Sequence, residues 1–95
     1  MPLTRGTEPY DANRFSVDFV MLDGDQRVSC CVAAEALRSR GGVTRFTDDA
    51  ANEQLFLRFR NEIERAASAK YDRGNFDFDG VLITSNDLGH GGPPP

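Results

Sequence analysis

The sequence is poor in the residues that build most catalytic and metal sites. Among its 95 residues there are one histidine, two cysteines and no tryptophan. The histidine, His90, lies in the Gly/Pro-rich segment GHGGPPP, which argues against a zinc site shared with the cysteines. The sequence also has no Gly-rich phosphate loop and no Ser/His/Asp set. We therefore expect no catalytic, cofactor-binding or metal-binding residues.

Long hydrophobic runs are also missing. The longest unbroken apolar stretch is 30–34, far short of the roughly 20 residues that a membrane helix needs, so no membrane partner is expected. The N-terminal segment MPLTRGTEPYD has no apolar core and does not predict a secretory signal. Cys30 and Cys31 are adjacent, closer together than a disulfide normally allows. This pair predicts reduced thiols and a cytoplasmic protein.

Positive charge is too sparse to predict a nucleic-acid-binding surface. The net charge is −4, and only segment 27–73 is positive, with nine basic and seven acidic residues. A solvated helix face is therefore favoured over a docking face for nucleic acid built from Arg38, Arg40, Arg45 and Arg58. We expect the partner to be a protein or a second copy of the chain.

Alternating residues predict a β-hairpin over 15–32. Apolar residues at 15, 17, 19 and 21 are followed by Val28, Cys30 and Val32 on the same face of the next strand. Only an even loop, of two or four residues around Gly24, places Met21 opposite Val28 and keeps that apolar face together. Glycine at the first central position fits a type II′ turn.

Two helices are expected after the hairpin. A short helix over 33–40 lacks an N-terminal cap and ends at Gly41-Gly42. A longer helix begins at Thr47, Asp48 or Asp49 and runs without interruption to about residue 72, before Gly74. Its apolar stripe consists of Leu55, Phe56, Phe59, Ile63, Ala66 and Ala67. Leu57 falls outside that stripe.

A last strand over 80–86 completes the predicted order β-β-α-α-β. The pattern there leaves open whether Leu82 or the pair Val81 and Ile83 is buried. The fold class is α+β: a small antiparallel sheet of three or four strands with two helices packed on one face. We divide the chain into an N-terminal arm (1–13), a single domain (14–88) and a disordered Gly/Pro tail (89–95). The expected core comprises Phe15, Val17, Phe19, Met21, Val28, Cys30, Val32, Leu37, Phe59, Ile63 and Ile83.

Several segments together resemble a family of small bacterial proteins. The segments are YDANRFSVDF, DGDQRVSCCV, EAL, FRNEIERAASAKYDRG and DGVLITSNDL, in this order. The family they resemble is the domain-of-unknown-function family numbered 1488. The resemblance implies an α+β fold with antiparallel strands, two helices and an additional N-terminal strand, although Leu3, Thr4 and Arg5 make a poor strand here. It implies no activity and no catalytic residues.

The predicted helices cover one sheet face and leave the other open. A half-apolar open face is a plausible partner surface, and its candidate residues are Val20, Leu22, Arg27 and Cys31, joined by Leu57 of the longer helix. We therefore expect a non-enzymatic protein-binding or regulatory module that can form a homodimer. The alternatives are a nucleic-acid accessory protein using the arginines of 38–65 and a thiol-dependent enzyme or redox protein using Cys31.

Overall fold

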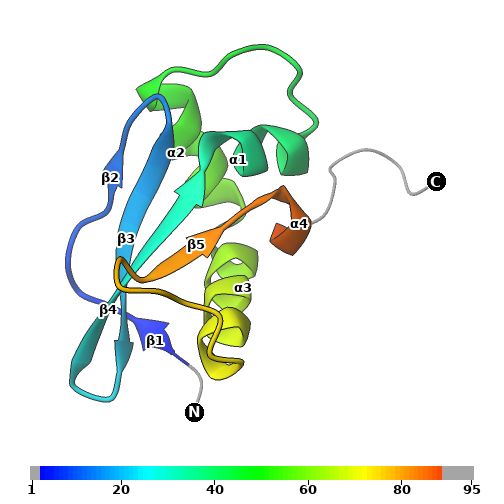
Figure 1. Ribbon diagram of the computed structural model, residues 1–95. Coiled ribbons are helices and arrows are strands. Elements are labelled where there is room, and N and C mark those ends of the chain that lie inside the picture. The colour runs from blue at the N-terminus through cyan, green and yellow to red at the C-terminus, as the bar shows by residue number, and fades with distance from the viewer. Residues whose placement is uncertain (1–2, 89–95) are drawn as a thin grey trace.

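The computed structural model describes residues 3–88, which form one mixed sheet with a layer of helices on one side (Figure 1). The predicted tail 89–95 lies outside the described residues. The elements are β1 (Thr4–Arg5), β2 (Asp11–Ala12), β3 (Ser16–Asp23), β4 (Gln26–Ala33), α1 (Ala34–Gly41), α2 (Asp49–Arg58), α3 (Arg60–Asp72), β5 (Val81–Ile83) and α4 (Ser85–Leu88). The α+β class is confirmed.

The hairpin of β3 and β4 has the predicted register. Met21 pairs with Val28, and Asp23 pairs with Gln26, so the loop is the two-residue Gly24-Asp25. Gly24 has φ 62°, while Asp25 does not have a positive φ. A positive φ at the first central residue alone matches a type II′ turn and excludes type I′. The alternation of apolar residues was therefore sufficient to set the pairing.

The sheet is mixed, whereas a purely antiparallel sheet was expected. β1 and β2 both pair antiparallel with β3, so the predicted arm 1–13 contributes two short strands, and the additional N-terminal strand is present. At the other edge, β5 pairs parallel with β4. The chain between β4 and β5 passes through the helices, and such a long connection allows the parallel direction.

One face of the sheet, here called the inner face, packs against the helices. Val17, Val32 and Ile83 of this face are completely buried, as are Leu37 and Ile63 of the helices. Burying each such side chain contributes about 1.5–3 kcal/mol. In β5 the inner residues are Val81 and Ile83, while Leu82 is 52% exposed on the opposite, outer face.

Phe15 is a correction to the predicted core, because its side chain is 72% exposed. It precedes the first residue of β3, and its backbone is held by local bonds. Its N–H donates to Oδ1 of Asn13 (2.8 Å), and its carbonyl accepts from the N–H of Ala34 (2.9 Å). The alternation of the strand therefore does not extend to this residue. Phe59, also placed in the core, is only partly buried.

The prediction of one uninterrupted helix from about residue 47 to 72 is wrong in one respect, because the helix is divided at Phe59. This residue has φ −108° and ψ 17°, and α2 ends before it while α3 begins after it. No glycine or proline marks the break. The side chain of Asp48 caps α2 by accepting from the N–H of Ala51 (2.9 Å), as one of the expected caps. α3 ends before Gly74, which has φ 74°.

Candidate functional site

The predicted partner surface is largely brought together on the outer face of the sheet. Val20 and Leu22 of β3 and Cys31 of β4 are half-buried there, and Arg27 is exposed. Cys31 is paired in register with the exposed Leu82. Leu57 is 43% exposed but belongs to α2, in the helix layer, so the structure separates it from the other four residues.

A groove crosses this outer face between the N-terminal segment and the end of the 73–80 loop. Its volume is about 450 Å³. Its floor is formed by outer-face residues of β3 and β4, and its rims by Pro9 and the first residue of β2 on one side and by a residue before β5 on the other. The side chains concerned are those of Pro9, Asp11, Asp18, Val20, Ser29, Cys31 and Asp79.

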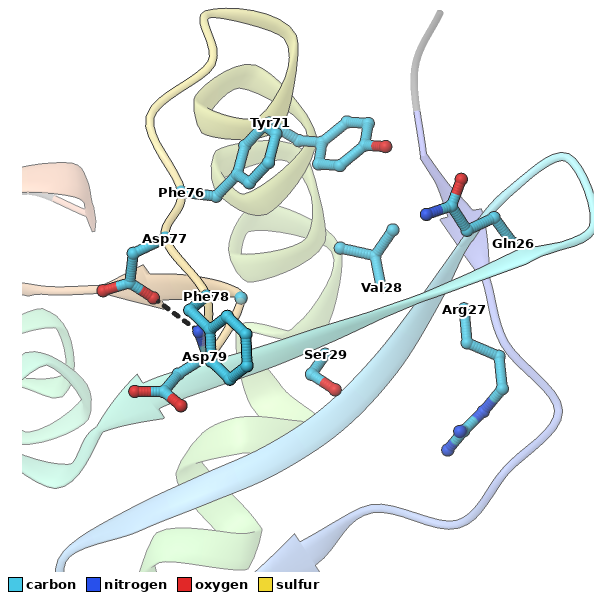
Figure 2. A pocket seen from close by; sticks show the side chains of 10 residues that line it. Gln26, Arg27, Val28, Ser29, Tyr71, Phe76, Asp77, Phe78 and Asp79 are labelled. Atoms are coloured by element: carbon cyan, nitrogen blue, oxygen red, sulfur yellow. Dashed lines mark hydrogen bonds between the residues drawn. The ribbon is translucent and has the colours of Figure 1, made fainter.

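A second hollow of about 240 Å³ lies beside the first, between the 73–80 loop and β4 (Figure 2). Tyr71 and Phe76 stack above it with ring centroids 4.8 Å apart. The hydroxyl of Tyr71 donates to Oδ2 of Asp23 (2.7 Å), which ties α3 to the hairpin. Ser29 and Asp79 line both hollows. The first hollow lies on the outer face, and the second lies at the edge of β4 below Tyr71, where inner-face Val28 also lines it. We name the two adjoining hollows together the outer groove.

A tight turn holds the loop against β4 at the centre of the outer groove. Asp77 and Gly80 exchange backbone hydrogen bonds of 3.1 Å, and Oδ1 of Asp77 accepts from the N–H of Asp79 (2.8 Å, Figure 2). Gly80 has φ 111°, and a Cβ there would lie 2.1 Å from the carbonyl oxygen of Ser29. Only glycine permits this close approach. The turn therefore presents Phe78, fully exposed, from a fixed backbone.

The outer groove is acidic. Four aspartates line it: Asp11, Asp18, Asp77 and Asp79. Arg27 lines it as well, but its guanidinium forms a two-pronged ion pair with Glu8, with Nη2 2.7 Å from Oε1. Since that pair is internally neutral, the groove offers carboxylates beside exposed aromatic and aliphatic side chains.

Cys31 is a free thiol whose surroundings favour the protonated form. Burial raises the pKa of the Cys31 thiol, and its hydrogen bond to Asp18 raises it further. Burial likewise raises the pKa of Cys30 to about 12. A nucleophilic cysteine needs the opposite environment, one that favours the thiolate. The surroundings of Cys31 thus suit a structural thiol.

The four arginines considered for nucleic acid do not form one face. Nε of Arg40 donates to Glu62 (2.6 Å), and the guanidinium groups of Arg40 and Arg58 both lie over the ring of Phe59. Four-residue spacing in a helix would allow Glu62 to pair with Arg58, but Glu62 instead pairs with Arg40, and no Arg58–Glu62 pair is among the ion pairs of residues 3–88. Arg60 and Glu64, with the same spacing, do pair, at 3.2 Å. Arg38 and Arg45 lie elsewhere, beside Phe46.

Sequence reasoning missed Phe78, the most exposed large hydrophobic residue in the described chain. The dipeptide Asp79-Gly80 by itself predicts only a turn and does not single out Phe78. A phenylalanine inside such a turn has no strand or helix to bury it, and that was the available signal. Between residues 3 and 88, no three His, Cys, Asp or Glu side chains are grouped to hold a metal ion. No helix in this part of the chain has the length and apolarity needed to cross a bilayer.

Comparison with known proteins gives one family. The family described as "Protein of unknown function (DUF1488)" matches residues 4–83, which include every strand and the three longer helices. No curated protein and no solved structure gives a match.

Proposed function

This chain belongs to the DUF1488 family of proteins of unknown function, and from its surface we propose that it is a non-enzymatic protein-binding module. The observation that carries this proposal is Phe78, fully exposed on a turn that Gly80 and Asp77 hold in place. An apolar side chain on a rigid backbone loses little freedom on binding, so docking against it is favoured. Aromatic residues are also enriched where protein interfaces gain most of their affinity.

The charge of the outer groove specifies the kind of partner. Asp77 and Asp79 flank Phe78, and Asp11 and Asp18 continue the acidic lining across the sheet. A protein segment with alternating basic and apolar side chains would match both features. Opposite charges across an interface accelerate encounter and select the partner. The groove therefore recognises a basic, partly apolar protein segment.

Titration of the labelled protein with designed peptides tests this proposal. The probe is a peptide that alternates arginine with leucine, compared with a peptide of the same length in which glutamate replaces arginine. We expect NMR shifts at Ser29, Cys31 and Asp79 with the basic peptide alone, weakening as salt is added. Shifts confined to the helix layer would contradict the proposal.

A matched pair of substitutions measures the contribution of the turn. Phe78→Ala removes the exposed ring of the groove, whereas Leu57→Ala removes an exposed apolar side chain of α2, outside it. We expect Phe78→Ala to weaken peptide binding by about 2 kcal/mol, about 30-fold, as for an interface hot spot. Leu57→Ala should leave affinity unchanged. Equal affinities of the two variants would argue against a role for Phe78.

A further inference from the structure

A second distinctive surface lies at the end of the molecule where β3 begins. Two Arg-Phe dipeptides, Arg14-Phe15 and Arg45-Phe46, are far apart in the sequence, yet Arg14 and Phe46 line the same depression. The rings are exposed, Phe15 by 72% and Phe46 by 66%. The guanidinium of Arg14 lies 5.8 Å from the centroid of Phe15, and that of Arg38 lies 5.6 Å from the centroid of Phe46. We call these five residues the basic-aromatic end.

Arg14 and Arg45 of this end are exposed, and none of Arg14, Arg38 and Arg45 takes part in an ion pair within residues 3–88. Arg38 is partly buried, and its Nη1 donates to the hydroxyl of Thr47 (3.3 Å). Two aspartates line the same depression: Asp48 accepts from the N–H of Ala51 at the start of α2, and Asp49 is exposed. Arginine and aromatic residues are the types most enriched in protein interfaces. The end therefore has the composition of a contact surface.

We propose that the basic-aromatic end of one chain occupies the outer groove of a second copy. This inference rests on the proposed function, because it names the occupant of the same groove. The end supplies three arginines and two exposed rings, and the groove supplies four aspartates and the exposed Phe78. The basic-aromatic end and the outer groove have no lining residue in common. The end of one chain can therefore contact the groove of another while its own groove stays accessible.

Local charge, rather than net charge, is the ground for this occupant. The chain carries a net charge of −4, so a polyanion and a second copy are both repelled by the molecule as a whole. A second copy offsets that repulsion by bringing a local cluster of carboxylates and an exposed ring to the arginines. The contact joins two different surfaces, which makes it heterologous, and it can be repeated from copy to copy.

Charge reversal on each surface tests the contact. The end variant is Arg14→Glu with Arg45→Glu, and the groove variant is Asp11→Arg with Asp79→Arg; all four side chains are exposed. Light scattering and sedimentation are followed at low salt over a concentration series from about 1 μM to about 1 mM. Arg65→Glu and Asp25→Arg, exposed positions outside both surfaces, are the controls. Circular dichroism verifies that every variant is folded.

We expect the unmodified chain and both controls to associate, and added salt to weaken that association. Each double variant should raise the apparent Kd at least tenfold, because like charges then meet at the contact. An equimolar mixture of the two variants should associate again, because each charge pair is restored with opposite sign. A mixture that remains monomeric would overturn the inference, as would controls that dissociate equally.

The same experiment separates failure of the inference from failure of the proposed function. A chain that stays monomeric across the series, yet binds the arginine–leucine peptide in its outer groove, refutes the second copy as occupant and leaves the protein-binding function standing. A monomeric chain that binds a single-stranded oligonucleotide through Phe15 and Phe46 also overturns the inference. Loss of both self-association and peptide binding would refute the two proposals together.

Discussion

On the inner face of the sheet Val17 and Val32 are completely buried, whereas on the outer face Val20 and Cys31 are half-buried and Leu82 is 52% exposed. Both faces come from the same alternating strands. The difference arises because the helices cover the inner face, while short segments of the N-terminal arm and the 73–80 loop only flank the outer one. The inner face therefore supplies stability, and the outer face leaves apolar groups beside carboxylates, where a partner can reach them.

The largest expected effect compares two phenylalanines that the alternating pattern placed on one face. Phe19 is 4% exposed and Phe15 is 72% exposed. Phe19→Ala should lower the free energy of unfolding by about 3–5 kcal/mol, because it empties a packed core position. Phe15→Ala should change it by less than about 0.5 kcal/mol. Urea denaturation measures both, and equal losses would show that the two faces are not distinct.

An intermediate effect is expected where the 73–80 loop meets the sheet. Gly80→Ala should cost at least about 2 kcal/mol, because it combines a positive φ with a Cβ 2.1 Å from the carbonyl oxygen of Ser29. Gly24→Ala is the control, since its φ is also positive but no atom lies within 4 Å of the added Cβ. The control should cost about 1 kcal/mol.

The consequence of the Gly80 substitution should be local to the outer groove. Since Gly80 holds the turn that presents Phe78, Gly80→Ala should also weaken peptide binding, whereas Gly24→Ala should not. Peptide titration of both variants under folding conditions measures this. If Gly80→Ala lost stability but kept full affinity, the presentation of Phe78 by this turn would be unimportant.

The smallest expected effect concerns a polar cluster at the free edge of β5. Nζ of Lys70 donates to the carbonyl of Leu82 (2.6 Å) and to Oδ2 of Asp87 (2.9 Å), and Oδ2 also accepts from the N–H of Thr84 (2.8 Å). Burial opposes ionisation of Asp87, but the Thr84 N–H, the Lys70 ammonium and the Thr84 hydroxyl together hold the pKa of Asp87 below its ordinary value of 3.8. The cluster thus covers an edge that could pair with another strand.

This lowered pKa predicts how stability depends on pH. The folded chain binds fewer protons at Asp87 than the unfolded chain, so its stabilisation is present above pH 3.8 and is lost as pH falls through the lowered pKa. Asp87→Asn should cost about 1.5 kcal/mol at neutral pH and remove this part of the acid dependence. Asp25→Asn, exposed in the hairpin turn, should retain it. Urea denaturation at several pH values checks both.

The local features of the fold could be read from residue types. The hairpin register followed because a one-residue slip would place Val28, Cys30 and Val32 of β4 on the opposite face from Val17, Phe19 and Met21 of β3. Gly24, Gly42 and Gly74 all adopt the positive φ expected at a turn or a helix end. These predictions succeeded because each depends on a few neighbouring residues. The division at Phe59 could not be read in this way, because packing, rather than glycine or proline, accompanies the break.

The candidate site was predictable only in part. Alternation placed Val20, Leu22, Arg27 and Cys31 on one face, because side chains of a strand alternate strictly. It could not reveal that the 73–80 loop would bring Phe78 and Asp79 to that face. Nor could the sequence show that Leu57 lies apart from these four residues. A helical pattern shows which side of the helix is exposed, but not which face of the sheet the helix covers.

The sequence by itself determined the hairpin, its turn, the glycine-marked ends of α1 and α3 and the two sets of alternating side chains, since these depend on backbone geometry over short distances. Only the tertiary structure decided that β5 runs parallel to β4, that Phe15 is exposed, and that Arg14 and Phe46 line the same depression. The physical reason is that such contacts join residues far apart along the chain. Their geometry follows from how the helix layer packs on the sheet, which no local pattern records.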